Sequence, residues 1–420
     1  MSTRALELAY GHGTARVQVP DKNFLGSFEP HDDEQVEDEA ALLRHAMDHP
    51  IGSPRLRELL KPGQKIAIVT SDLTRPCPTP QLMPYIEEEL QAARIPDADV
   101  TIVIALGLHR AMTEAELQQA VGDEAFARFK VINHDVNDCV RLGVTRAGTP
   151  VEIFRPLVEA DVRICLGNLE FHYFAGFSGG AKAILPGCAS RATVTANHSM
   201  MVRAEAAAAR LAGNPVREDL EEGVAMLGVD FILNVGVDVH HRIVAAVAGD
   251  LTQAHRAGCE LVAKRGKVDL PARADIVLVS AGGYPKDINL YQGQKALDNA
   301  KYAVKDGGVV ILAAECMEGL GNRTFEEWLM SAKSPDDLIR RIQDQFVLGG
   351  HKAAAIAVVQ KNADVFLVSA IPTETVQRCG LIPFDSLQAA LDEALRRKGA
   401  TASILALPQG GSTLPMASDH

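Results

Sequence analysis

The feature that most constrains the fold is a regular alternation of short apolar segments with helical segments. In the first part of the chain the apolar segments have the length of single strands, and they read KIAIVT at 65–70, VTIVIAL at 100–106, FKVI at 129–132 and VRICLG at 162–167. Thr113 and Glu116 form a capping box that predicts a helix over 113–121, between two of these strands. Strands that alternate with helices form βαβ units, so the sequence predicts an α/β fold with a mostly parallel sheet.

The same alternation starts again near residue 275, after the Pro-containing segment KVDLPARA at 267–274, which we expect to be a linker. Its expected strands are DIVLVSA at 275–281, GGVVILAA at 307–314, DVFLVS at 364–369 and ASILAL at 402–407. We therefore predict two α/β domains with mostly parallel sheets. The N-terminal one, over 1–266, is expected to bind the cofactor and carry the catalysis, and the C-terminal one, over 273–420, to close over the cleft. The active site is expected in this interdomain cleft, and the segment 408–420 is expected to be loose.

Composition excludes several classes of protein. The chain has 42 basic and 54 acidic side chains and a formal net charge of −12, which argues against nucleic acid as a partner. No apolar run approaches the ~20 residues that span a membrane, and the residues MSTRALELAYGHG contain no apolar secretion signal. The seven cysteines are scattered and odd in number, which favours reduced thiols. We therefore expect a cytoplasmic protein that acts without nucleic acid or membrane.

Polar residues gather in the loops that follow the predicted strands. Asp72 and Arg75 follow the strand at 65–70, and an arginine can bind a carboxylate or a phosphate through two hydrogen bonds. His109 follows the next strand, and a histidine can act as acid or base near neutral pH. An Asp–Arg turn and a structural histidine explain the same residues without a function, so both interpretations stay open at this point.

The densest cluster is EFHYFAGFSGGAKAILPG at 170–187. Its glycines Gly176, Gly179 and Gly180 permit the backbone to approach a ligand closely, and Lys182 is a candidate for phosphate contact or covalent attachment. The segment matches neither the Walker loop nor the GxGxxG dinucleotide turn. A Gly-rich surface turn with a solvated lysine is the alternative.

Two further clusters are weaker alone. Asn197 and His198 offer an imidazole that suits zinc, copper, iron or nickel, although no second ligand lies at a familiar helical spacing. Tyr291, Gln292 and Lys295 begin a predicted helix of the second domain, and their polar groups are expected to face the loops of the first. A structural histidine and an ordinary first helical turn are the alternatives.

Taken together, these segments resemble the nickel-dependent lactate racemase family. The matching strings stand in the order of the family, and they are SDLTRP at 71–76, ALGLHRAMTEAE at 105–116, HYFAGFSGGAKAILPG at 172–187, NH at 197–198 and GGYPKDINLYQGQKALDNA at 282–300. The intervals also agree, with ten residues from His172 to Lys182 and sixteen from Lys182 to His198.

The resemblance implies an isomerase that racemises or epimerises a 2-hydroxy acid with a tethered cofactor, the nickel pincer nucleotide. Lys182 would carry this nucleotide through a thioamide, and His198 would complete the ligands of the nickel. Asp72 and the three glycines of the 170–187 segment would help to hold the nucleotide. Separate enzymes would make and load the cofactor, so these maturation enzymes are expected partners.

The resemblance also implies a mechanism by reversible hydride transfer from C2 of the substrate to the cofactor. His109 and His172 would alternate as acid and base on the hydroxyl proton, one for each enantiomer. The expected substrate-binding residues are Arg75 and Lys295, for the carboxylate, and Tyr291 and Gln292, for the wall of the pocket. Phe171 and Tyr173 depart from the small or proline neighbours expected in lactate-specific members, so the substrate is expected to be lactate or a larger 2-hydroxy acid.

Two other classes of function stay open on the sequence. The first is a dehydrogenase or lyase with a diffusible nicotinamide or a simple metal, which the missing GxGxxG turn and metal-ligand spacing disfavour. The second is a non-catalytic nucleotide or hydroxy-acid binding protein on the same fold, which the presence of both His109 and His172 with Lys182 disfavours.

Overall fold

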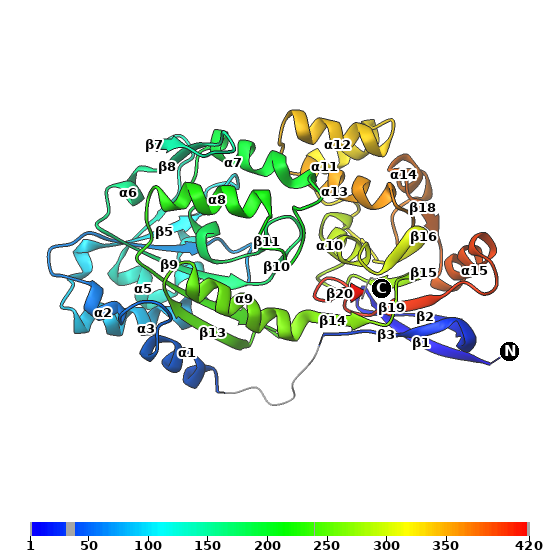
Figure 1. The fold of residues 1–420 in the computed structure, drawn as a ribbon, viewed down its shortest axis with the longest axis horizontal. Coiled ribbons are helices and arrows are strands. Elements are labelled where there is room, and N and C mark those ends of the chain that lie inside the picture. Colours follow the sequence, from blue (N-terminus) through cyan, green and yellow to red (C-terminus); the bar gives the residue numbers. More distant parts are fainter. Residues whose placement is uncertain (1, 31–37, 239, 418–420) are drawn as a thin grey trace. The chain divides into compact units, whose positions relative to one another are not determined.

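The computed structural model in Figure 1 describes residues 2–30, 38–238 and 240–417. The chain folds as two compact units. The middle unit comprises residues 33–264, and the terminal unit combines residues 1–32 with residues 265–420. Each unit has its own sheet and its own core.

The middle unit is built on a six-stranded sheet with the order β13-β12-β9-β4-β5-β6. Its strands are β4 (Ile66–Ser71), β5 (Val100–Ala105), β6 (Lys130–Asn133), β9 (Val162–Leu169), β12 (Phe231–Val237) and β13 (Ile243–Gly249). Neighbouring strands from β12 to β6 are parallel, and β13 is antiparallel to β12. The predicted mostly parallel sheet is therefore confirmed.

The order of the strands creates a switch point between β4 and β9. The chain continues from β4 to β5 and β6 on one side, whereas β9 and β12 lie on the other side of β4. In open parallel sheets, ligands bind outside the carboxyl ends of the strands at such a point. Asp72 and Arg75 follow the end of β4, and His172 follows the end of β9, so the topology brings these loops to one edge of the sheet.

Helices of the middle unit cover the sheet. Buried side chains of the β-strands pack in one core with five helices, which are α1 (Glu39–Asp48), α2 (Leu56–Leu59), α3 (Thr79–Ala92), α4 (Glu114–Val121) and α5 (Asp123–Arg128). The capping box is confirmed, since the Thr113 side chain accepts a hydrogen bond from the backbone of Glu116 at the start of α4. The remaining elements are β7 (Cys139–Val144), β8 (Pro150–Phe154), α6 (Arg155–Val158), β10 (Phe171–His172), β11 (Gly176–Phe177), α7 (Arg191–His198), α8 (Pro215–Ala225) and α9 (Gln253–Gly266).

The terminal unit is built on a second six-stranded sheet, with all its strands parallel in the order β18-β17-β16-β15-β19-β3. These strands are β3 (Phe24–Ser27), β15 (Ala274–Ser280), β16 (Val304–Ala313), β17 (Ala363–Val368), β18 (Ile382–Phe384) and β19 (Ile404–Leu407). The cores on its two faces include residues of α10 (Leu290–Ala300), α11 (Arg323–Ser331), α12 (Pro335–Asp344), α13 (Gly350–Gln360), α14 (Thr373–Arg378) and α15 (Leu387–Lys398).

The structure differs from the predicted domain division at the N-terminus. The hairpin of β1 (Thr3–Tyr10) and β2 (Gly13–Pro20) packs Leu8, Val17 and Val19 into the core of the terminal unit, and β3 pairs with β19. Residues 1–32 therefore belong with the C-terminal half and not with the domain predicted over 1–266. The physical reason is burial, because these alternating apolar side chains need a sheet face, and the one they cover is formed by β15, β16, β17 and β19.

The segments expected to be a linker and a loose tail form strands. β14 (Lys267–Leu270) pairs in parallel with β20 (Leu414–Ala417). Their side chains Val268, Leu270 and Leu414 are buried. The Pro and Gly residues around these short segments favour loops, so the sequence predicts neither strand.

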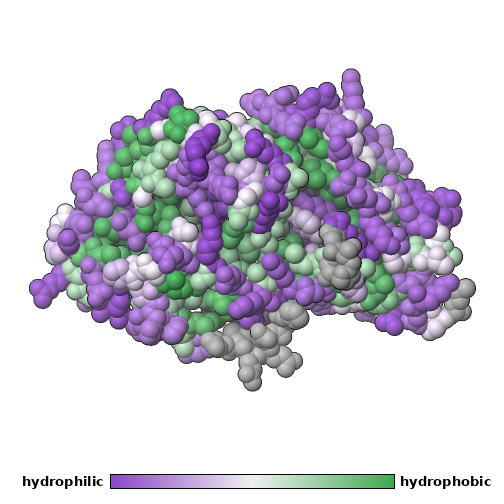
Figure 2. Space-filling model, in the orientation of Figure 1, coloured by the Kyte–Doolittle hydropathy of each residue, from purple (hydrophilic) through white to green (hydrophobic). Residues whose placement is uncertain are grey.

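On the face shown in Figure 2, hydrophilic side chains cover most of the surface, and apolar residues show in smaller areas between them. Large apolar side chains with substantial exposure include Leu73, Val144 and Met317, which are far apart in the sequence. Among the described residues, no helix combines the length and the apolarity that crossing a membrane requires.

We predict that Leu8→Ala destabilises the terminal unit specifically. Leu8 is 1% exposed in the core of that unit, and truncation of a buried leucine costs about 2–5 kcal/mol. Hydrogen exchange should show faster exchange across 265–417 with unchanged protection in the core strands of 33–264. Arg16→Ala, on the exposed side of the same hairpin, is the control and should change stability by under about 0.5 kcal/mol. Equal loss of protection in both units would contradict the assignment of the hairpin.

Candidate active site

Asp72 and His109 form a close pair at the carboxyl edge of the middle sheet. Asp72 Oδ2 lies 2.6 Å from His109 Nδ1, and Asp72 Oδ1 accepts hydrogen bonds from the backbone and the hydroxyl of Thr74. Burial alone would raise the pKa of Asp72, but the hydrogen bonds from His109 and Thr74 and the charges of His109 and Arg75 outweigh it and lower the pKa. The carboxylate accepts the Nδ1 hydrogen of His109, and Nε2 is the ring atom that can exchange a proton.

Arg75 is an exposed cation beside this pair. Its backbone N–H donates to the carbonyl oxygen of Asp72 and closes a turn at the end of β4. Its charge also lowers the pKa values of His172 and Lys182, so its field reaches both of these groups. An exposed guanidinium in this place suits the carboxylate of a small acid.

His172 is held in the short hairpin of β10 and β11. The backbone N–H of Ala175 donates to its Nδ1 at 3.3 Å, so the hydrogen of the neutral ring is on Nε2. Burial, followed by the charges of Lys182, Arg75, His198 and Arg217, holds the pKa of His172 well below its ordinary value. His172 is therefore neutral at physiological pH.

The ring of Phe174 lies in the middle of the site. His172 meets it edge-on with the ring centroids 4.5 Å apart, and His198 meets it at 4.9 Å. Lys182 Nζ lies 5.7 Å from the same ring centroid. We call these four residues the Phe174 cluster, and it shows that the predicted acid/base, attachment and metal-binding residues of this loop and of α7 gather around one buried aromatic ring.

Lys182 is the residue with the most unusual electrostatic surroundings. It lies in a single turn of 3-10 helix over Gly180–Ala183. Removal from water, and then the charges of Arg217 and Arg75, hold the pKa of its amine well below the ordinary value, although Glu170 acts in the opposite direction. An amine that loses its proton so readily is a nucleophile and can form an amide-type bond.

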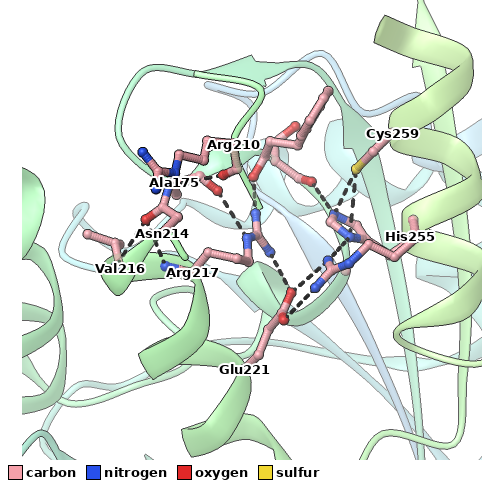
Figure 3. Close-up of polar contacts among 12 residues, drawn as sticks. Ala175, Arg210, Asn214, Val216, Arg217, Glu221, His255 and Cys259 are labelled. Atoms are coloured by element: carbon pink, nitrogen blue, oxygen red, sulfur yellow. Dashed lines mark hydrogen bonds and ion pairs between the residues drawn. The ribbon is translucent and has the colours of Figure 1, made fainter. Parts of the chain in front are cut away.

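Arg217 on α8 is the buried cation behind this loop (Figure 3). Its side chain is fully buried, and it donates from Nε to the carbonyl oxygen of Ala175 at 3.0 Å and from Nη2 to that of Phe177. Glu221 lies 3.5 Å from Nη1 and also pairs with Arg256. Burial lowers the pKa of Arg217 to about 10, so the guanidinium stays charged and clamps β11 to α8.

The glycines of the loop are required by packing inside the protein. A Cβ on Gly179, which has a φ of +69°, would stand 2.7 Å from both Asn234 Oδ1 and Leu169 Cδ2. Gly176 faces the carbonyl oxygen of Arg210 and Gly180 faces the ring of His255 in the same way. Protein atoms thus occupy the positions that side chains would need, and a cofactor-binding role for these glycines stays a prediction.

His198 ends α7 and is 7% exposed. Its Nδ1 lies 2.9 Å from Oδ1 of the preceding Asn197. Among the described residues, no group of three or more histidine, cysteine or acidic side chains is placed to hold a metal ion.

Phe171 and Tyr173 differ in their surroundings. Tyr173 stacks on His172 with an interplanar angle of 11° and a centroid distance of 5.3 Å. Phe171 packs against Phe177 and an apolar cluster of the middle unit, since it and the next residue of the strand, His172, point to opposite faces. Only Tyr173 of this pair lies against the candidate acid/base residue.

The other predicted substrate-binding residues belong to the terminal unit, on the first turns of α10. Gln292 and Lys295 are exposed, and the backbone N–H of Gln292 is capped by Asn289. Tyr291 is partly exposed, and Lys352 Nζ lies 4.0 Å from its ring centroid and donates to its carbonyl oxygen. A substrate-binding role for the three residues stays a prediction.

Several residues of the site were not found from the sequence, namely Phe174, Arg217, Asn234, His255 and Lys352. Phe174 was in the quoted motif, but nothing in its spacing singled it out. Arg217 and Glu221 carry opposite charges at i and i+4, a spacing that predicts an ion pair on the surface of a helix. This spacing does not predict the hydrogen bonds from Arg217 to the loop of Ala175 and Phe177.

We predict that Arg217→Met lowers the free energy of unfolding of the middle unit by about 2–5 kcal/mol, because the carbonyl groups of Ala175 and Phe177 lose their buried donor. Urea unfolding measures this loss. Arg256→Met is the matched control, because Arg256 pairs with the same Glu221 but is about a third exposed, and it should cost less than about 1 kcal/mol. Equal losses in the two variants would show that the clamp contributes nothing beyond the ion pair.

We also predict that Lys182→Met raises the pKa of His172. A neighbouring cation disfavours the imidazolium form, so its removal favours protonation, while burial keeps the pKa below its ordinary value. NMR titration of the ring protons in the cofactor-free protein would measure the shift. Lys61→Met, at an exposed lysine of the same unit, should leave the titration unchanged. A His172 midpoint that stays constant or falls in Lys182→Met would refute the assigned coupling.

Comparison with known proteins agrees with this arrangement. The family model described as lactate racemase N-terminal domain matches residues 10–210, and the one described as lactate racemase C-terminal domain matches residues 270–414. The protein named lactate racemase from Thermoanaerobacterium thermosaccharolyticum is 33% identical over 97% of this chain and 98% of its own. The one from Lactiplantibacillus plantarum is 30% identical over the same shares.

Solved structures give the same result. The structure of the lactate racemase apoprotein from Thermoanaerobacterium thermosaccharolyticum matches with a TM-score of 0.89 and 33% identity, over 98% of this chain and all of that one. A protein from Thermotoga maritima shares the fold at 17% identity with a TM-score of 0.66, over 92% of this chain and all of its own. With matches that span both units and all the motifs of the candidate site, the chain belongs to the lactate racemase family and is an isomerase of the racemase type.

Proposed function

We propose that this enzyme interconverts the stereoisomers of a 2-hydroxy acid, either lactate or a larger member of the class. The observation that carries the proposal is the Phe174 cluster, in which His172, Lys182 and His198 lie around one buried ring. The charge of Arg75 lowers the pKa values of both His172 in this cluster and Asp72 in the Asp72–His109 pair. The names of two relatives, both lactate racemases, support the reaction type.

We further infer that the enzyme works with a nickel pincer nucleotide attached to Lys182. The residues present fit this group, because the Lys182 amine loses its proton readily and His198 carries hydrogen on Nδ1, which leaves the lone pair of the neutral ring on Nε2 for a metal. His198 would be the protein ligand of the nickel, and Asp72 and the glycines Gly176, Gly179 and Gly180 would lie along the nucleotide. When bound, the group supplies a hydride acceptor for the C2 hydrogen of the substrate.

The protein's part of the reaction is to move the hydroxyl proton. His109 takes or returns it at Nε2, because Asp72 holds the Nδ1 hydrogen and fixes the tautomer. The hydroxyl proton must leave as the C2 hydrogen departs, since loss of hydride from a neutral hydroxyl carbon would create an unstable cation. The same group protonates the oxygen again when the hydrogen returns.

His172 serves the opposite enantiomer in this proposal. Its Nε2–H can donate to the substrate oxygen. To take the hydroxyl proton at Nε2, the neutral ring must carry its hydrogen on Nδ1 instead, which requires that the weak 3.3 Å bond from Ala175 to Nδ1 is given up. Attachment of the cofactor would help, because an amide-type bond at Lys182 removes an amine whose protonated form lowers the pKa of His172. Loading of the cofactor would then adjust the acid/base residue as well as supply the hydride acceptor.

The substrate carboxylate would be held by Arg75, with Lys295, Tyr291 and Gln292 contributing from the terminal unit. Arg75 has a planar guanidinium that matches a carboxylate through two hydrogen bonds. Tyr173, stacked on His172, would determine the size of the pocket beside the reacting carbon and favour a substrate other than lactate itself. Loading by separate maturation enzymes in the cytoplasm completes the proposal.

We predict that Lys182→Ala abolishes both the nucleotide adduct and racemisation in protein co-expressed with the maturation enzymes. Intact mass spectrometry measures the adduct, and chiral chromatography of a 2-hydroxy-acid panel measures the activity. His109→Gln and His172→Gln should keep the adduct and lose turnover by about 10²–10⁴-fold, as expected for loss of an acid/base group. Lys61→Ala, an exposed lysine, should change neither.

A substrate with deuterium at C2 tests the chemistry independently. If the hydrogen leaves and returns as hydride, the deuterium stays in the inverted product, whereas removal as a proton would exchange it with water. Inversion in fully matured Lys182→Ala, or complete exchange of the label with solvent, would overturn the proposed function.

A further inference from the structure

His198 is held at the end of α7 by the side chain before it. His198 Nδ1 lies 2.9 Å from Asn197 Oδ1, and both side chains are buried, with exposed fractions of 7% and 0%. The ring of Phe174 contacts His198 edge-on at an interplanar angle of 71°. The ring is therefore held through a hydrogen bond at one nitrogen and through its contact with the ring of Phe174.

The direction of the Asn197 amide determines which nitrogen of His198 carries hydrogen. Asn197 Nδ2 donates to the carbonyl oxygen of Val216 at 3.0 Å and to Asp219 Oδ2 at 2.8 Å. A carbonyl oxygen only accepts, so the NH₂ end of the amide points to α8 and the oxygen end faces His198. Since that oxygen also only accepts, the hydrogen lies on His198 Nδ1, and the lone pair of the neutral ring lies on Nε2.

Asp219 is in turn held by the turn between β7 and β8. Its carboxylate accepts hydrogen bonds from the hydroxyl groups of Thr145 and Thr149, and it is 3% exposed. Thr145 and Thr149 also bond to each other through backbone and side-chain groups. Three hydroxyl or amide donors from two elements thus converge on one buried carboxylate, which fixes the place of Asn197.

We propose that Asn197 and Asp219 are positioning residues that set His198 in the Nδ1–H tautomer and thereby make Nε2 its metal-binding atom. The metal-binding part rests on the proposed function. A histidine that binds a metal commonly donates its second N–H to a carboxylate or carbonyl oxygen, and loss of such a partner lowers metal affinity by about 10–100-fold. Here a side-chain amide connects the imidazole to the carboxylate, so two residues share this task.

The first test needs no cofactor. Long-range ¹H–¹⁵N NMR of the cofactor-free protein reports the tautomer of each histidine ring, and His198→Gln assigns the signal. We expect the Nδ1–H form of His198 in the unaltered chain and loss of this preference in Asn197→Leu. The double variant Asn197→Asp with Asp219→Asn exchanges the two groups. The new carboxylate at 197 would accept a hydrogen bond from His198, and the new amide at 219 would donate to that carboxylate. This double variant should restore the Nδ1–H form of His198.

The second test uses enzyme matured with nickel. Chelator challenge followed by metal analysis should show nickel leaving Asn197→Leu about 10–100-fold faster than the unaltered enzyme, with the exchanged pair in between. Asn133→Leu is the matched control, because Asn133 also makes two hydrogen bonds through its amide, both to Met112, in the same unit. It should change neither the His198 tautomer nor the nickel retention.

The outcomes separate the two proposals. An Nε2–H form in the unaltered chain, an unchanged tautomer in Asn197→Leu, or equal nickel retention in both would overturn the positioning role. If Asn197→Leu does not fold, the tautomer of the unaltered chain and of the exchanged pair decides the matter. A correct tautomer in a matured chain that takes up no nickel and no adduct would leave the Asn197 assignment in place and overturn the proposed cofactor.

Discussion

A buried guanidinium is the interaction on which the candidate site depends. Arg217 reaches from α8 to the carbonyl oxygens of Ala175 and Phe177, which lie in the turn and the second strand of the hairpin that carries His172 and leads to Lys182 (Figure 3). A charge with so little water around it acts on its neighbours as well as on the backbone. After burial, which is the largest cause, this charge contributes to the lowered pKa values of His172, Lys182 and His255, so one side chain shapes the loop and also adds to its electrostatic character.

The two candidate acid/base histidines differ in the charges that surround them. His109 stands next to a carboxylate, whereas His172 stands among cations and accepts only a weak backbone hydrogen bond. In the proposed reaction, the two enantiomers of the substrate would therefore meet acid/base groups with different electrostatic surroundings. In the proposed function, amide formation at Lys182 reduces this difference, because it removes an amine that lowers the pKa of His172 when it is protonated.

The fold explains why these groups meet. β4 and β9 are neighbours in the sheet although about ninety residues of chain separate them, and the loops after both strands emerge at the same edge. The hairpin of β7 and β8 supports α7 and α8 from the side through Asp219, so the metal-binding histidine proposed here depends on residues from three separate elements.

The sequence by itself determined the α/β class, the positions of most of the parallel strands, the capping box at Thr113 and the segments that hold the candidate site residues Asp72, His109, His172, Lys182 and His198. Local periodicity and the ordered motifs were sufficient, because these properties depend on neighbours within a few residues or on a pattern shared with a family. Only the tertiary structure decided that residues 1–32 belong to the terminal unit, that Phe174 lies between His172, Lys182 and His198, and that Asn197 presents its oxygen to His198. These features depend on packing and hydrogen bonds between residues far apart in the chain, such as Arg217 with Ala175 or Asp219 with Thr145, and no local pattern encodes such partners.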